Sequence, residues 1–416
     1  MMHSNQILLP FAVFIFIFIF ILCFSPSSAH NKTHTPSNPT PNPPPTSNPT
    51  PDPSSSVSYK GAFSKVYAFG DSYTDTGNAR LLGGLTSFIG ALMRNSPYCS
   101  SSSSSGLHNR LSDGKLVIDY LCEALSLPYL PPYKDTSLDF SHGVNFAVAG
   151  STALSTDYYI NNRVGQTLVW KDIPQTVQTQ VNWFNKFLLN VECNGMNHLA
   201  CKGQLENSLF WVGELGMYDY SRTYGSSVSI KWLIDLSVSS TCRLVKALLD
   251  RGAKYIVVQS LPPTGCLPFD ISLSPVSDHD NLGCADTANT VTQTHNELLQ
   301  AKLAEQQKQY PDSIIAYADI WNAYYTVLKN PSQFGFSEPF KACCGCGKGD
   351  LNFDLRSLCG ARNTRVCSDP SKHITWDGVH LTEAMHHVLA DLLLNKGYCK
   401  PSFDQLVKKK RSCTAN

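Results

Sequence analysis

"YAFGDSYTDTGN", residues 67–78, leads from an apolar run through a glycine into small polar side chains. Uninterrupted apolar residues are typical of a strand buried on both faces, and the glycine indicates a turn. Ser72 therefore lies where a strand ends. We expect Asp71, Asp75 and Asn78 to brace this turn through hydrogen bonds to its backbone. A serine in such a turn is either a helix cap or a nucleophile, and this stretch leaves both open.

Apolar runs alternate along the chain with longer segments that have apolar residues at helical spacing. The runs are 65–72, 143–150, 208–215, 254–261 and 313–320. The helical segments are 112–125, 230–252, 287–310 and 382–397. This alternation predicts an α/β fold with a mainly parallel, five-stranded sheet covered by helices on both faces.

Three of the predicted strand ends carry residues of chemical interest. They are Ser72, Gly150 and the segment 213–219. The carboxyl ends of parallel strands share one edge of a sheet, and ligands bind in the crevice there. We therefore expect these three loops to meet in one site.

Composition excludes some classes of function. The 416 residues carry a formal net charge of +1, which gives no reason to expect a nucleic-acid partner. The run Lys408–Arg411 is interpreted as part of a solvated basic tail, residues 401–416. No glycine-rich phosphate loop is apparent, and the sequence predicts neither a cofactor nor a metal.

The N-terminal residues predict entry into the secretory route. An apolar stretch, Ile7–Phe24, precedes Ala29, and together residues 1–29 have the form of a signal peptide. An uncleaved membrane anchor is the alternative, because the stretch is long and no Lys or Arg precedes it. After cleavage we expect no stable membrane association.

Residues 30–60 are rich in Pro, Ser and Thr, which predicts an extended linker that cannot form a core. Asn31 lies there in an N-x-T sequon and is the predicted glycosylation site. The folded domain is expected at 61–400.

The cysteines favour an oxidising compartment. Of 15 cysteines, Cys23 lies in the apolar stretch, which leaves an even number in the rest of the chain. A cluster could be either a zinc site or disulfides, and we favour disulfides because paired C-x-x-C halves are missing. Its members are Cys343, Cys344, Cys346, Cys359 and Cys367.

A nucleophilic serine needs a base, and the base needs a carboxylate to orient it. The stretch WDGVHLTEA contains Asp377 and His380, and an i, i+3 spacing on a helical turn would place both side chains on one side. The carboxylate would then hold one imidazole nitrogen while the other faces Ser72.

These motifs together resemble the plant GDSL-type esterase/lipase family of SGNH hydrolases. FGDSYTDTGN and WDGVHLTEA carry the resemblance, and RLSDGKLVIDYL, GVNFAVAGSTAL, PPTGCLP and FKACCG support it in the same order. The resemblance implies a three-layer α/β/α sandwich of flavodoxin-like type and a Ser-His-Asp triad. Ser72 is implied as nucleophile, His380 as base and acid, and Asp377 as the residue that orients His380. The backbone N–H groups of Ser72 and Gly150 are implied to form the oxyanion hole.

One position departs from the family pattern. The third block normally reads Gly-x-Asn-Asp, and its Asn donates to the oxyanion; here GELGMYDY, residues 213–220, places Tyr218 at that position. The hydroxyl lies further from the backbone than an amide, so we expect it to need movement to reach the same point. Loss of one oxyanion donor costs about 100- to 1,000-fold in kcat.

The sequence therefore predicts a serine esterase or lipase that acts on carboxylic ester bonds of a small molecule through an acyl-enzyme. Two alternatives stay open because of Tyr218: an acyltransferase that uses the same acyl-enzyme, and a weakly active or non-catalytic secreted relative. We expect a secreted glycoprotein of the cell wall or apoplast, with the vacuole and other secretory compartments open. The acyl and alcohol parts of the substrate and the oligomeric state are not predicted.

Overall fold

The computed structural model describes residues 58–82, 97–98, 109–161, 175–223, 226–347 and 349–414. The predicted signal peptide, Asn31 and nearly all of the predicted linker lie outside these residues. The folded unit spans Ser56–Asn416.

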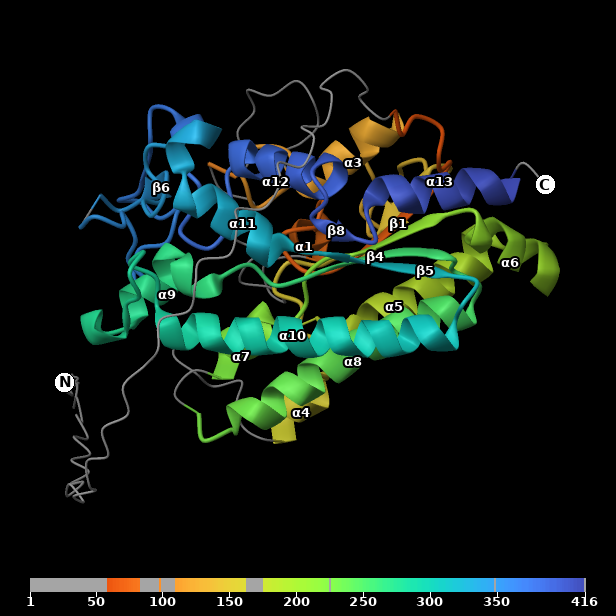
Figure 1. The fold of residues 1–416 in the computed structure, drawn as a ribbon, viewed down its shortest axis with the longest axis horizontal. Helices are drawn as coiled ribbons and strands as arrows, with labels where there is room; N and C mark the ends of the chain where they lie inside the picture. Colours follow the sequence, from red (N-terminus) through yellow and green to blue (C-terminus); the bar gives the residue numbers. More distant parts are fainter. Residues whose placement is uncertain are drawn as a thin grey trace, which may run out of the picture. The chain divides into compact units, whose positions relative to one another are not determined.

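A six-stranded sheet runs through the centre of this unit, in the order β2-β1-β3-β4-β5-β8 (Figure 1). Its strands are β1 (Val66–Phe69), β2 (Gly143–Asn145), β3 (Leu209–Val212), β4 (Tyr255–Gln259), β5 (Ile314–Ala318) and β8 (Cys399–Lys400). β1 to β5 are parallel, with Tyr67 paired to both Val144 and Phe210. The five predicted strands are confirmed. β8 was not predicted and adds an antiparallel edge beside Tyr317 and Ala318.

Helices cover both faces of the sheet, which makes three layers. α3, α11, α12 and α13 lie on one side, and α5, α8 and α10 lie on the other (Figure 1). The α-helices are α1 (Asn78–Leu82), α3 (Val117–Leu125), α4 (Thr156–Asn161), α5 (Val177–Phe187), α6 (His198–Glu206), α7 (Met217–Thr223), α8 (Ile230–Asp250), α9 (Pro268–Leu273), α10 (Asp286–Gln309), α11 (Ile320–Lys329), α12 (Glu383–Asn395) and α13 (Phe403–Thr414).

Short elements complete the fold. A π-helical turn, η2 (Leu188–Glu192), extends α5, and 3₁₀ turns lie in the connections between described elements: η3 (Thr264–Cys266), η4 (Val276–Asp278), η5 (Pro331–Phe334) and η6 (Pro370–Lys372). A separate two-stranded ladder pairs β6 (Cys344–Gly345) with β7 (Arg365–Val366).

The core explains the apolar runs. Every residue of β1, β3, β4 and β5 is buried, as expected for strands with helices on both faces. Between the β2 end of the sheet and α5, rings pack edge to face or stacked, which gives aromatic pairs their favourable geometry. The rings are those of Phe69, Phe146, Phe184 and Phe210.

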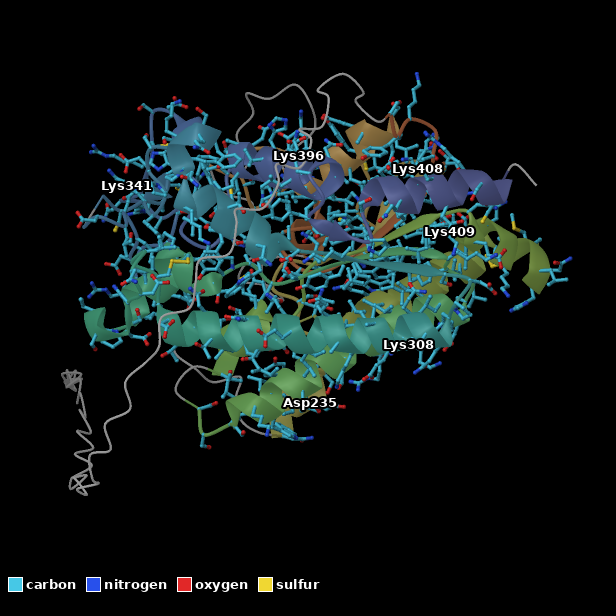
Figure 2. All side chains as sticks on the ribbon, viewed as in Figure 1. Asp235, Lys308, Lys341, Lys396, Lys408 and Lys409 are labelled. Carbon is cyan, nitrogen blue, oxygen red and sulfur yellow. A yellow bond between two sulfur atoms is a disulfide. The ribbon has the colours of Figure 1, made fainter. Side chains whose placement is uncertain are left out.

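The expectation of a solvated tail at 401–416 is wrong in part. Residues Phe403–Thr414 form α13, whose Phe403, Leu406 and Val407 are fully buried against the domain. Lys408 and Lys409 lie on its exposed face (Figure 2), whereas Lys410 is buried and donates to Asn207 Oδ1 at 2.6 Å. Apolar residues at helical spacing thus outweigh the basic run that dominates the local composition.

Candidate active site

The turn that carries Ser72, the predicted nucleophile, begins directly after β1. Gly70 has φ +141°, and a Cβ there would lie 3.0 Å from Cα of Gly213 in the turn after β3, so glycine permits the two turns to touch. The N–H groups of Thr74 and Asp75 then donate to the carbonyl of Asp71 in one tight turn. Ser72 lies within this turn and is 1% exposed.

Asp75 ties this turn to its surroundings. One carboxylate oxygen accepts the N–H groups of Gly77 and Asn78, each at 2.7 Å, and the other accepts that of Ala149 at 2.8 Å. Asn78 in turn donates to the carbonyls of Asn145 and Ala147. The predicted bracing of the turn is confirmed, and it also holds the segment just before Gly150 against the nucleophile.

The side chain of Gln180 on α5 also links the turn at Gly70 to the loop at Gly150. Its amide pairs with both backbone groups of Gly70, accepting at 3.0 Å and donating at 2.8 Å, and also donates to Ser151 Oγ at 2.9 Å. Gly150, with φ +82°, lies directly before Ser151. Two independent side chains, Asp75 and Gln180, therefore fix the segment around Gly150 relative to Ser72.

The third loop comes from β3 and leads into α7. Asp219 is fully buried and accepts the N–H groups of Ala153 and Leu154 and the hydroxyl of Tyr159, at 2.6–2.9 Å. This fixes α7 against the Gly150 loop, and it places the preceding residue, Tyr218, beside Ser72. The Tyr218 hydroxyl donates to Ser72 Oγ at 3.1 Å and lies 3.4 Å from His380 Nε2.

Asp377 and His380 lie in a tight loop before α12, so the expectation that they share a helical turn is wrong. The N–H of Trp376 donates to the carbonyl of His380 at 2.7 Å and closes this loop. Asp377 Oδ1 accepts the N–H groups of Val379 and His380, and Oδ2 lies 2.7 Å from His380 Nδ1. The pairing of carboxylate and imidazole is as predicted, although the backbone that produces it is not helical.

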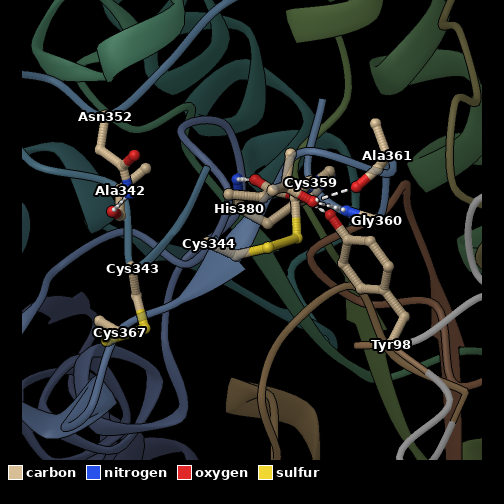
Figure 3. The surroundings of a disulfide bond; sticks show 12 residues. Tyr98, Ala342, Cys343, Cys344, Asn352, Cys359, Gly360, Ala361, Cys367 and His380 are labelled. Carbon is tan, nitrogen blue, oxygen red and sulfur yellow. Dashed lines mark hydrogen bonds and ion pairs between the residues drawn. A yellow bond between two sulfur atoms is a disulfide. The ribbon is translucent and has the colours of Figure 1, made fainter. Parts of the chain in front are cut away.

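Tyr98 supplies a further donor that the sequence did not reveal. Its hydroxyl donates to Asp377 Oδ2 at 2.5 Å, and its ring is 5% exposed. Figure 3 shows this hydroxyl pointing toward the catalytic loop, beside the Cys344–Cys359 disulfide. Four hydrogen bonds thus hold the Asp377 carboxylate, and they fix the imidazole of His380 in one orientation.

The electrostatics favour a charged Asp377. Burial raises the pKa of its carboxyl, but His380 and the hydrogen bonds from His380 and Tyr98 outweigh burial and hold the pKa below its usual value. Burial raises the pKa of Tyr218 well above its usual range, so its hydroxyl keeps its proton and remains a donor. With Nδ1 donating to Asp377, Nε2 of His380 is left as an acceptor facing the nucleophile.

No direct hydrogen bond joins Ser72 Oγ to His380 Nε2 within the described part of the chain; the Tyr218 hydroxyl lies between them. The structure thus gathers Ser72, Tyr218, His380 and Asp377 at the carboxyl edge of the sheet. This is where the strand order reverses, with β1 lying between β2 and β3.

The predicted helix at 112–125 begins later than expected. Helix α3 begins at Val117, five residues after Ser112, where we expected the helix to start. Asp113 instead accepts the N–H of Glu383 at 2.7 Å, at the start of α12. It therefore supports the helix that follows the catalytic loop.

The cysteine cluster forms disulfides. Cys343 pairs with Cys367 and Cys344 with Cys359, while Cys346 is free. Two more disulfides join Cys193 to Cys201 and Cys266 to Cys284. Among the residues that the structure describes, no cluster of His, Cys, Asp or Glu is arranged to hold a metal ion.

Each helix among the described residues is too short or too polar to cross a membrane.

Known proteins are similar to this chain over most of its length. The family model for GDSL-like lipase/acylhydrolase matches residues 66–393. The GDSL esterase/lipase At3g48460 of Arabidopsis thaliana is 43% identical over 356 residues, which cover 84% of this chain and 90% of that protein. Acetylajmalan esterase 2 of Rauvolfia serpentina is 35% identical over 335 residues, covering 80% and 90% respectively. The chain is therefore a member of the GDSL-like lipase/acylhydrolase family, a family of carboxylic-ester hydrolases.

Proposed function

We propose that the chain is a secreted carboxylic-ester hydrolase in which Ser72 is the nucleophile and an acyl-enzyme is the intermediate. The observation that carries this proposal is the continuous set of contacts from Asp377 through His380 and the Tyr218 hydroxyl to Ser72 Oγ. Acyl transfer needs an oriented imidazole whose Nε2 can accept the proton of a serine, and here one hydroxyl, that of Tyr218, lies between His380 Nε2 and Ser72 Oγ.

In the proposed reaction, Ser72 Oγ attacks the ester carbonyl carbon and passes its proton to His380 Nε2. The tetrahedral intermediate collapses, and the alcohol leaves with the proton from His380. Water then gives a proton to His380 and attacks the acyl-enzyme, and Ser72 leaves with its proton restored. Asp377 stays ionised throughout and stabilises the imidazolium.

Tyr218 takes the role of third oxyanion donor in this proposal, beside the backbone N–H groups of Ser72 and Gly150. Its hydroxyl already lies 3.1 Å from Ser72 Oγ, which will be bonded to the carbon that carries the oxyanion. A small rotation toward an arriving carbonyl oxygen moves the donor from Oγ to that oxygen. The same rotation removes the hydroxyl from between Ser72 and His380, so that the proton can pass directly.

Acetate esters are the first substrates to assay, because one relative is named for an acetyl ester and the site is built for acyl transfer. We propose hydrolysis of p-nitrophenyl acetate by the full chain, purified from a secretory host. Ser72→Ala removes the nucleophile, and Ser141→Ala is a matched control because Ser141 is exposed before β2, at the amino edge of the sheet.

The proposal predicts turnover in the natural chain and in Ser141→Ala, and none above background in Ser72→Ala. Turnover that survives in Ser72→Ala contradicts it. Slow hydrolysis that rises with an added acceptor alcohol would instead favour acyl transfer, and an inactive natural chain would favour the non-catalytic alternative.

Secretion rests on separate support. Four disulfides between described cysteines suit an oxidising compartment. We propose that residues 1–29 are removed and that Asn31 is glycosylated. N-terminal sequencing of the secreted protein and a mass shift on removal of N-glycans test these two points, and retention of residues 1–29 would favour the membrane anchor.

A further inference from the structure

Two buried carboxyl groups stand beside the nucleophile and take no part in the reaction described above. Asp71, 0% exposed, directly precedes Ser72, and Glu214, 1% exposed, directly follows Gly213 after β3. β1 and β3 are neighbouring parallel strands, and the N–H of Gly213 donates to the carbonyl of Phe69 at 2.8 Å. The two turns are therefore in contact, and their carboxyl groups share one buried space.

The hydrogen bonding around this pair is incomplete unless a proton lies within it. Asp71 Oδ1 accepts the N–H of Tyr73 at 3.2 Å. Its Oδ2 and both oxygens of Glu214 have no well-formed bond to an N–H or hydroxyl group in the described residues. The carboxyl groups of Asp71 and Glu214 lie within hydrogen-bonding reach of each other, and the backbone N–H groups of Tyr73 and Glu214 also approach the Glu214 carboxyl. Two ionised carboxylates are both acceptors, so a bond between them requires one proton.

Electrostatics also favour one proton between Asp71 and Glu214. Burial raises the pKa of Glu214, and the neighbouring charge of Asp71 raises it further, to well above its usual range. Burial also raises the pKa of Asp71, while the bond to Glu214 and the nearby His380 lower it. Two like charges in one buried contact cannot both persist, and the pair titrates as a unit.

Other titratable groups face the pair from the surrounding elements. They are Tyr73 from the nucleophile turn, Tyr218 and Asp219 from α7, and His380 from the catalytic loop, with Tyr324, Asp377 and His386 lying beyond Tyr73.

We propose that Glu214 is protonated in the resting protein and donates its O–H to Oδ2 of ionised Asp71. This bond joins the turn that carries Ser72 to the loop that carries Tyr218, four residues after Glu214. It also leaves one negative charge beside His380, where it stabilises the imidazolium formed during acyl transfer. Glu214 and Asp71 are thus positioning residues, and their effect on catalysis rests on the proposed function.

The proton itself is tested by the pH dependence of stability. Glu214→Gln keeps the size and a donor but carries no ionisable group. The natural chain holds a proton in the folded state that its unfolded chain releases above about pH 4.3, so stability falls as pH rises. Above about pH 5, the unfolding constant of the natural chain divided by that of Glu214→Gln rises about tenfold per pH unit for as long as folded Glu214 stays protonated.

Urea unfolding of the full chain with its disulfides intact measures this ratio. A ratio that does not change with pH would overturn the proposal, because it would mean that Glu214 ionises alike in both states. The measurement needs no turnover. An inactive natural chain would therefore refute the proposed function and leave the test of the proton intact.

The positioning role is tested by comparing Glu214→Gln with Glu214→Met. Methionine fills a similar volume but cannot donate to Asp71, whereas the glutamine amide can. We expect kcat/KM for p-nitrophenyl acetate to fall at least about tenfold in Glu214→Met and to recover most of that loss in Glu214→Gln, since a hydrogen bond to a charged group contributes this much. Equal losses in the two variants would contradict the positioning role. If Glu214→Met does not fold, the comparison is made with Glu214→Leu.

Discussion

Replacement of Tyr218 by phenylalanine removes one hydroxyl and leaves the buried ring in place. In the resting structure this hydroxyl donates to the neutral Ser72 Oγ at 3.1 Å, a bond that contributes about 1 kcal/mol. In the proposed transition state the Tyr218 hydroxyl donates to the oxyanion, and one such donor contributes about 3–4 kcal/mol. The difference, about 2–3 kcal/mol, predicts a fall in kcat of roughly 30- to 160-fold.

Steady-state hydrolysis of p-nitrophenyl acetate measures this effect. We expect KM to change little, because the interaction is made mainly in the transition state. Tyr220→Phe is the matched control. Its hydroxyl lies two residues further along α7 and meets His295 Nδ1 at 2.7 Å, so its loss should leave kcat within about twofold.

An unchanged or higher kcat in Tyr218→Phe would refute this reasoning. It would mean that the hydroxyl does not reach the oxyanion and that its position between Ser72 and His380 only obstructs proton transfer.

Three further predictions concern the surroundings of the site. Tyr98→Phe should lower kcat about tenfold, measured by the same assay, because it removes a hydrogen bond to the charged Asp377 carboxylate; an unchanged kcat would contradict that role. The double variant Cys344→Ala/Cys359→Ala should lower the free energy of unfolding by about 3 kcal/mol in urea, from the 15-residue separation that this disulfide closes; a change well under 1 kcal/mol would contradict it. Burial lowers the pKa of His386 to about 3, so the unfolded chain binds a proton that the folded chain does not, and stability falls as pH drops below about 6.5. His386→Leu should therefore reduce the pH slope of the unfolding free energy by about 1.4 kcal/mol per unit between about pH 4 and 6, and an equal slope in both proteins would refute this.

The sheet was predictable from the sequence because its five parallel strands are buried on both faces. Continuous hydrophobicity is a strong local signal, and each apolar run contains one observed strand. β8 was missed because two residues, Cys399 and Lys400, pair with the sheet edge and carry no pattern of their own. The start of α3 was misplaced because the polar residues Ser112 and Asp113 bind a segment far along the chain: Ser112 Oγ donates to the carbonyl of Leu381, and Asp113 accepts the N–H of Glu383 at the start of α12.

The candidate site also contains residues that the sequence could predict and residues that it could not. Ser72, Asp377 and His380 were found because they lie in short motifs of specific composition. The loop form of Asp377–His380 was not predictable, since an i, i+3 spacing fits a tight loop as well as a helix. Tyr98 and Glu214 were missed because their partners, Asp377 and Asp71, are 279 and 143 residues away in the sequence and only the fold brings them together.

The most direct test of the account is covalent labelling of the nucleophile. A fluorophosphonate probe reacts with a serine that has an activated hydroxyl, and mass spectrometry of the digested full chain identifies the residue modified. The account predicts one adduct per chain on the peptide that contains Ser72, and none in Ser72→Ala. Labelling at another residue, or no labelling of a folded natural chain, would contradict the assignment of Ser72 as the nucleophile.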